Sequence, residues 1–316
     1  MYDALAFPES TMRLDVRPRH CILCHAKSPD SWEHVIPEYL GGRLQVPLLC
    51  TPCNSTIGSK LVGQLKRDPG IRIAAERLAP KMPRLYEAMR RGWTYVAKGP
   101  EDQTVRVKAG KSRDRIVARR TPKGSLLIDT KEARRKIEEM LVSEAVPLAE
   151  IKKHLQRLES AKNLQVIEFP SGISTVLQPI ESLQPDLAHP LADERLFALV
   201  ALEYLFLVIG NQVLVPYFGP VVAYILNGDR PEYLGVEHLK SGQYSASHRI
   251  YVVPTPRQIQ VYIWIFGYHV YRVTFGRLGN TLRQAPVYLE DLEARQSLWA
   301  ASLEEARRGN FMSLRA

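Results

Sequence analysis

The chain has 316 residues and is basic, with 43 lysines and arginines against 33 aspartates and glutamates and a formal net charge of +10. An excess of positive charge suits a polyanion such as nucleic acid, although it identifies no partner by itself. Residues 1–20 hold charges and prolines instead of an apolar core, which argues against a secretory signal peptide. We therefore expect a soluble protein of the cytoplasm.

The four cysteines of the chain form two C-x-x-C pairs, Cys21/Cys24 and Cys50/Cys53. Each pair can bind one ion through two thiolates, and the reducing cytoplasm favours thiols over disulfides. Two such pairs in one short segment predict a structural zinc site with four sulfur ligands. Free buried thiols or a redox pair are the alternatives.

The segment between the cysteine pairs is expected to form a short hairpin. Residues 32–36 are β-prone and favour a strand. Pro37 cannot donate to a strand ladder, and Gly41-Gly42 favour a turn, so the strand ends quickly. The chain is expected to return through residues 48–49 to the second cysteine pair.

A helix is expected after the second pair, capped by Asn54 or Ser55 and running to about Lys66. Zinc bound by the cysteines would clamp the hairpin to the start of this helix, and in so small a module a metal supplies much of the folding energy. The apolar residues of the helix recur every fourth position and form one stripe, made of Ile57, Leu61 and Leu65.

Together these motifs resemble the HNH, or ββα-metal, endonucleases, in particular the branch with a zinc knuckle of two C-x-x-C pairs. The resemblance covers about residues 18–66. It implies an α+β protein that begins with a zinc-stabilised, treble-clef-like ββα-metal module. The matching residues are Cys21-Ile22-Leu23-Cys24, Trp32-Glu33-His34-Val35-Ile36-Pro37, Leu40-Gly41-Gly42, Leu48-Leu49-Cys50-Thr51-Pro52-Cys53-Asn54 and Gly58-Ser59-Lys60.

The resemblance also implies roles for three residues. His34 would be the general base, and Glu33 and Asn54 would be ligands of a catalytic Mg²⁺ or Mn²⁺. Many relatives carry an aspartate where this chain has Glu33. The middle asparagine of the family name, which steadies the base, has no clear counterpart in residues 43–49, and Gln45 or a backbone carbonyl is the candidate for that task.

Residues 67–185 are expected to form a basic connecting region. Residues 76–91 can form a basic amphipathic helix, and further helices are expected at 131–142 and 148–158. Positive side chains gather in residues 98–123, where a solvated surface is the alternative to a DNA-binding one. We expect the following cluster to contact phosphates of the DNA backbone without reading its sequence: Arg113, Arg115, Arg119 and Arg120.

Residues 186–316 are expected to form an α+β domain that selects the target or senses a trigger. A helical pair at about 190–228 precedes β-rich segments within 249–275, and a charged helix is expected at about 287–309. The apolar run at 196–210 is shorter than the roughly 20 residues that a bilayer requires and contains Glu203, so it predicts a core helix and no membrane span. This domain is also the expected contact for a second copy of the chain or a regulatory partner.

The sequence therefore predicts a metal-dependent endonuclease that hydrolyses DNA, with a role in restriction, anti-phage defence or a mobile element by analogy. Two alternatives remain open. One is a zinc-dependent nucleic-acid-binding protein that does not cleave, and the other is a nuclease directed at RNA.

Overall fold

The computed structural model describes two compact units. The first combines both ends of the chain, Met1–Met89 and Pro190–Ala316, and the second is the middle, Arg90–His189. Separate roles for residues 1–66, 67–185 and 186–316 stay a prediction. The structure describes residues 12–313 except for 92, 99–103, 109–114, 118, 121–125, 144, 160–164, 169–173, 179–183, 186–191 and 277–284.

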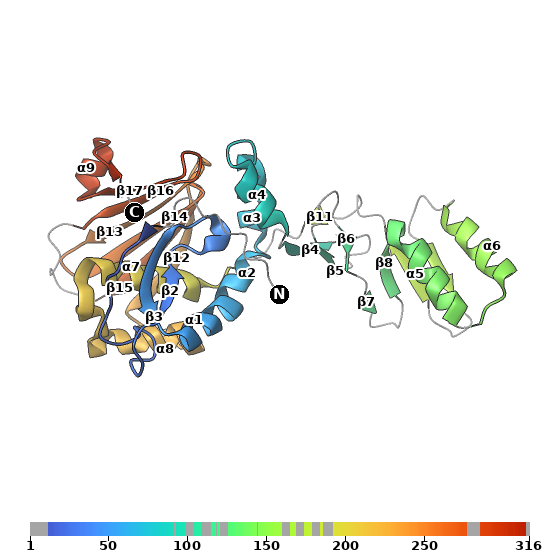
Figure 1. Cartoon of the computed structure of the whole chain (residues 1–316), viewed down its shortest axis with the longest axis horizontal. Helices are drawn as coiled ribbons and strands as arrows, with labels where there is room; N and C mark the ends of the chain where they lie inside the picture. The colour runs from blue at the N-terminus through green and yellow to red at the C-terminus, as the bar shows by residue number, and fades with distance from the viewer. Residues whose placement is uncertain are drawn as a thin grey trace. The chain divides into compact units, whose positions relative to one another are not determined.

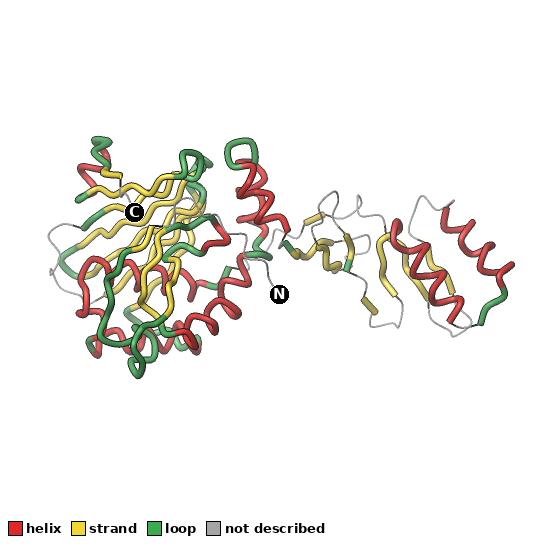
Figure 2. Tube along the Cα trace, in the orientation of Figure 1, coloured by secondary structure: helices red, strands yellow, loops and turns green. Residues whose placement is uncertain are grey.

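A seven-stranded antiparallel sheet forms the core of the first unit (Figures 1 and 2). Its strands, in spatial order, are β12 (Leu234–Lys240), β15 (His269–Gly276), β14 (Gln258–Ile265), β13 (Ser247–Pro254), β16 (Val287–Asp291), β17 (Gln296–Ala300) and β18 (Met312–Ser313). Apolar and polar residues alternate along β14, so every second side chain is buried, as in a sheet with one covered face. The mixed α+β class predicted from the sequence is confirmed.

Helix α7 (Glu194–Ile209) packs on the buried face of this sheet, against β12, β15 and β14, and α8 (Gly219–Asn227) packs on α7. The ring of Phe197 stacks on that of Tyr271, with their centroids 3.3 Å apart. By length and composition, Glu194–Leu214 is apolar enough to cross a membrane, but 67% of its most apolar window is buried inside the unit. Such burial is typical of a core helix.

The prediction of a charged helix at about 287–309 is wrong. This segment forms β16 and β17, followed by the short helix α9 (Leu303–Arg307). The carboxylate of Asp291 accepts hydrogen bonds from the backbone N–H groups of Glu293 and Ala294, which closes a turn between the two strands. Leu289 and Leu298, which a helix would have placed on one of its faces, instead pair across the hairpin.

The N-terminal part of the first unit is a hairpin followed by a helix. Strands β1 (Met12–Arg13), β3 (Leu44–Leu49) and β2 (Ser31–His34) form a sheet in that order. A one-turn helix, η1 (Glu38–Leu40), lies in the hairpin loop. The helix that begins within the second cysteine pair is continuous through α1 (Thr51–Ile57), the π-helical η2 (Gly58–Val62) and α2 (Gly63–Leu65).

The predicted cap of this helix is wrong, whereas its apolar stripe is confirmed. The N-cap is Cys50, and the first free N–H, that of Thr51, donates to the carboxylate of Asp30 at 2.6 Å. Asp30 therefore caps the helix from a distant part of the chain, which leaves Asn54 inside the first turns. The three apolar residues of the stripe are at most 2% exposed: Ile57, Leu61 and Leu65.

Two further helices follow, α3 (Pro69–Leu78) and α4 (Pro83–Arg91). The prediction of a single helix over residues 76–91 is therefore wrong. Pro80 and Pro83 explain the break, because proline lacks the N–H that a helix interior requires and clashes with the preceding turn.

Gly41 and Gly42 turn the hairpin loop in a way that other residues cannot. Gly41 has a φ of +91°, in the left-handed region, and a Cβ there would lie 2.7 Å from the side chain of Leu85. A Cβ on Gly42 would lie 1.8 Å from the carbonyl oxygen of Ile36. The predicted turn is thus confirmed, and both positions exclude a side chain.

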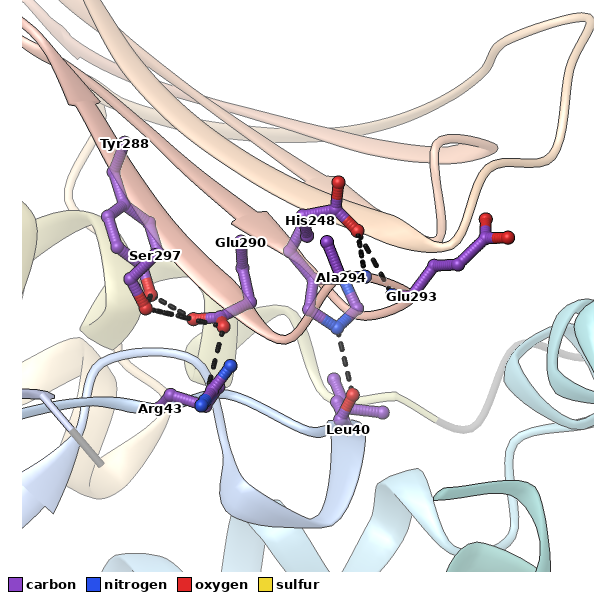
Figure 3. A network of polar contacts seen from close by, with 9 residues as sticks. Leu40, Arg43, His248, Tyr288, Glu290, Glu293, Ala294 and Ser297 are labelled. Carbon is purple, nitrogen blue, oxygen red and sulfur yellow. Dashed lines mark hydrogen bonds and ion pairs between the residues drawn. The ribbon is translucent and has the colours of Figure 1, made fainter. Parts of the chain in front are cut away.

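The hairpin loop is fastened to the buried face of the large sheet (Figure 3). His248 on β13 has no exposed surface, and its Nε2–H donates to the carbonyl of Leu40 at 2.8 Å. Its Nδ1 accepts from the N–H of Phe266 at 3.2 Å. Both ring nitrogens are therefore satisfied with the ring neutral, and burial lowers the pKa of His248 to about 4.

A second connection joins Arg43, next to the loop, to the sheet. The Nε of Arg43 lies 3.8 Å from the carboxylate of Glu290, which is fully buried on β16. The hydroxyls of Tyr288 and Ser297 also donate to that carboxylate. Burial nevertheless raises the pKa of Glu290 to about 7. A carboxylate with three polar partners at an otherwise apolar contact fixes where the loop can lie.

The second unit has two four-stranded sheets among its described residues. Its elements are β4 (Thr94–Lys98), β5 (Thr104–Lys108), β6 (Arg115–Ile116), β7 (Arg119–Arg120), β8 (Leu126–Asp129), α5 (Thr130–Ser143), α6 (Leu148–Glu159), β9 (Gln165–Glu168), β10 (Ser174–Gln178) and β11 (Gln184–Pro185). The first sheet, β11-β4-β5-β6, is antiparallel, whereas β7-β8-β10-β9 contains the parallel pair β8–β10. Helices α5 and α6 pack on each other and confirm the helices predicted at 131–142 and 148–158.

Replacing His248 by glutamine should remove part of the pH dependence of stability. In the unfolded chain His248 gains a proton below about pH 6.5, whereas in the folded chain it stays neutral until about pH 4. The free energy of unfolding of the parent protein should therefore fall as the pH falls through this window, by on the order of 3 kcal/mol from this group. Glutamine can donate and accept like the neutral ring but does not titrate.

Urea unfolding of both proteins at pH 7 and near pH 4.5 measures the difference. All other titrating groups are common to the two proteins, so their contributions cancel in the comparison. Identical pH dependence in the parent and in His248→Gln would contradict a buried neutral His248.

Candidate functional site

The four cysteines converge at one point between the hairpin and the helix. Their sulfur atoms all lie within 4.8 Å of one another, and the Sγ atoms of Cys24 and Cys50 are 3.7 Å apart. Two sulfurs on one tetrahedral zinc ion are roughly 3.8 Å apart, given a Zn–S bond of about 2.3 Å. A disulfide requires only about 2.05 Å. The geometry fits four thiolates around one ion, as the spacing of the pairs predicts.

Backbone hydrogen bonds shape the first pair into a knuckle. The N–H of Cys21 donates to the carbonyl of Lys27 at 2.7 Å, and the N–H of His25 donates to the carbonyl of Cys21 at 3.0 Å. The N–H of Ile22 donates to Leu48 at 3.1 Å, which ties the knuckle to β3. The imidazole of His25 lies 3.1 Å from the carbonyl of Ile22, so it supports the knuckle and stays outside the sulfur cluster.

Burial makes two thiols of the cluster resist ionisation. It raises the pKa of Cys21, which is fully buried, and that of Cys53. The pKa of Cys24 is lowered to about 7, where burial opposes the stronger combined effect of hydrogen bonds from the backbone at Ala26 and Lys27. Four thiolates so close together need a cation to offset their mutual repulsion.

His34 lies opposite Gln45 in the hairpin. The two residues are paired across β2 and β3, and the Gln45 amide nitrogen lies 2.9 Å from Nε2 of the imidazole. The Nε–H of Arg13, on the neighbouring strand, donates to the amide oxygen of Gln45 at 3.2 Å. Gln45 is thus held between a cation and the imidazole, which is the place expected for the residue that steadies the base.

His34 is partly exposed, and burial lowers its pKa from the ordinary value, while the charge of Glu38 opposes this. The ring is therefore neutral near pH 7. A neutral imidazole that still reaches solvent has the properties of a general base.

Glu33 on β2 and Asn54 on α1 each carry an oxygen atom that can bind a cation. The amide nitrogen of Asn54 donates to the hydroxyl of Ser31 at 2.7 Å, which joins α1 to β2. The pairing of β2 with β3 shifts register between Ser31 and Glu33, so a bulge interrupts the alternation of side chains there. With its nitrogen held by Ser31, the amide of Asn54 keeps its oxygen for another partner. Burial raises the pKa of Glu33 to about 7.

The structure brings the predicted residues into one region and links them through intermediaries. In the part of the chain that the structure describes, no hydrogen bond joins the side chains of His34, Glu33 and Asn54 directly. Gln45 contacts His34, and Ser31 contacts Asn54. Gln45 was a candidate from the sequence, whereas Ser31 was not, because its place three residues before His34 is a weak signal.

The predicted DNA-binding arginines belong to the second unit. Arg113 lies outside the described residues. Arg115 is in β6, and Arg119 and Arg120 form β7, which pairs with β8. Their contact with phosphates stays a prediction.

A hairpin, a following helix and a cluster of four cysteines are the parts of an HNH nuclease domain. Residues 21–69 match the family model described as HNH endonuclease, which confirms the resemblance, and this segment belongs to that family. An HNH domain implies a metal-dependent nuclease with a nucleic-acid substrate. No curated protein and no solved structure matches the chain.

Replacing Cys50 by serine should remove the structural metal and unfold the HNH domain. We expect the parent protein, purified without added metal, to contain one zinc ion per chain, since the sulfur geometry fits zinc. Elemental analysis and thermal unfolding measure both effects. Ser55→Ala, on the same helix but outside the cluster, should keep both the ion and the stability. A folded parent protein with no zinc would contradict the assignment.

Proposed function

We propose that this protein is an HNH endonuclease of the zinc-knuckle branch that hydrolyses DNA phosphodiester bonds. The observation that carries the proposal is the contact between His34 and Gln45 inside the matched HNH segment. It supports a neutral, partly exposed imidazole held in a fixed orientation within that segment. A domain that only bound nucleic acid would have no use for an imidazole held in this way.

In the proposed reaction His34 accepts a proton from water, and the oxygen of that water attacks the phosphorus. Gln45 fixes the orientation of the ring for this step, because its amide oxygen accepts from the Nε–H of Arg13 and its amide nitrogen lies 2.9 Å from Nε2 of His34. A negative charge on Glu38 favours the protonated ring that results.

The donor set fits a hard divalent cation such as Mg²⁺ or Mn²⁺. Glu33 offers a carboxylate, and Asn54 offers an amide oxygen that its bond to Ser31 leaves available. Such a cation, when bound, neutralises charge on the phosphate and stabilises the leaving 3′ oxygen. Glu33 and Asn54 would hold it, while the separate cluster of Cys21, Cys24, Cys50 and Cys53 would hold the structural zinc.

We assign the protein to the cytoplasm, with a role in restriction, anti-phage defence or a mobile element. The basic charge of the chain supports a polyanionic substrate. The C-terminal segment would select the target or sense a trigger. Cleavage of RNA is the second candidate, because the same base and cation act on either backbone.

Replacing His34 by alanine should abolish cleavage and leave binding nearly unchanged, because the loss of a general base typically costs about 10²–10⁴ in rate. The measurement incubates plasmid, single-stranded DNA and RNA with each protein in Mg²⁺, Mn²⁺ or EDTA. His25→Ala is the matched control, since His25 also lies in the HNH domain and its imidazole lies against the backbone carbonyl of Ile22. Parental cleavage by His34→Ala would show that the base is another residue.

Replacing four arginines of the second unit by glutamine should weaken binding to all DNA sequences alike. The affinity should also depend less on salt, with the log–log slope reduced by about one unit per lost phosphate contact. Fluorescence anisotropy across a salt series measures this slope. An unchanged slope would assign the four replaced residues to the solvated surface. These residues are Arg113, Arg115, Arg119 and Arg120.

A further inference from the structure

Glu203 is a buried acid in the middle of α7. It is 1% exposed and lies within the run Leu196–Phe206, all of which is buried. Among the described residues, no hydrogen-bond partner is found for its Oε1. A leucine at this position would avoid the cost of burying an unpaired polar group, which is about 1–3 kcal/mol. The requirements of the core therefore do not explain a glutamate here.

The position of Glu203 relates it to the HNH domain. Helix α7 contacts η2, the π-helical segment that continues the helix carrying Asn54. The carboxylates of Glu203 and Glu33 are close enough for the charge of Glu33 to add to the effect of burial, which raises the pKa of Glu203 well above its usual range. The free oxygen of a buried acid thus lies near the carboxylate proposed as a cation ligand.

Two carboxylates in a region with little water repel each other unless a cation lies between them. Glu33 and Asn54 alone give a divalent cation two protein ligands. Mg²⁺ and Mn²⁺ prefer six oxygen ligands, several of which are water, so there is room for another carboxylate.

We infer that Glu203 is a third protein ligand of the divalent cation, supplied to the HNH domain by the C-terminal segment of the chain. This inference rests on the proposed function, in which Glu33 and Asn54 hold that cation. It assigns a task in the nuclease site to a residue about 130 positions beyond the matched HNH segment. The HNH segment by itself would then have an incomplete cation site.

The test is a titration of the full-length, zinc-containing protein with Mn²⁺ in the absence of nucleic acid. Electron paramagnetic resonance of the free ion measures binding without any contribution from cleavage. Glu203→Gln should weaken Mn²⁺ binding by at least about tenfold, as the loss of a group in a metal site does. Its thermal unfolding temperature without Mn²⁺ should stay the same or rise, because glutamine keeps the shape and removes an acid.

Two comparison variants give the result its meaning. Glu33→Gln should weaken Mn²⁺ binding by a similar factor, since Glu33 is a ligand in the proposed function. Tyr204→Phe changes the neighbouring buried residue of α7, whose hydroxyl donates to the carbonyl of Pro286. It should leave Mn²⁺ binding unchanged.

The outcomes separate the two proposals. Weaker binding in Glu33→Gln but parental binding in Glu203→Gln would overturn the role of Glu203 and leave the proposed function intact. Parental binding in both variants would overturn the cation site itself. An equal loss in Tyr204→Phe would show a general response of the fold and would also overturn the role of Glu203.

Discussion

The HNH domain of this protein depends on being fastened at both of its ends. A segment of about fifty residues buries too little apolar surface to hold a catalytic group rigidly by itself. The cysteine cluster holds the knuckle against the helix start at one end. At the other end, His248 and Glu290 of the large sheet bind Leu40 and Arg43 of the hairpin. His34 and Gln45 lie between these two anchors, so the orientation of the proposed base follows from both.

Local motifs allowed most of the HNH domain to be predicted from the sequence. The cysteine pairs, the turn at Gly41-Gly42 and the apolar stripe of the helix each depend on residues a few positions apart. Features that depend on distant residues escaped prediction. The helix cap is one case, because the N–H of Thr51 donates to Asp30, which lies 21 positions earlier in the chain. The C-terminal hairpin is another, since a turn at Asp291 overrides a charged, leucine-containing pattern that reads as a helix.

The same distinction applies to the site. The adjacent pair of Glu33 and His34 stands out in the sequence, and the pairing of His34 with Gln45 follows once the hairpin register is known. Glu203 was visible only as an acid that interrupts an apolar run. Its relation to Glu33 depends on how α7 lies between the sheet and the HNH helix, and no local pattern contains that information.

The first unit consists of the two ends of the chain, and this has a consequence during synthesis by the ribosome. The hairpin leaves the ribosome early, but the groups that bind its loop at positions 248 and 290 are made roughly 200 residues later. At about 5–20 residues per second, that interval is on the order of 10–40 seconds. A chain interrupted in the middle therefore carries the whole HNH motif without its second anchor.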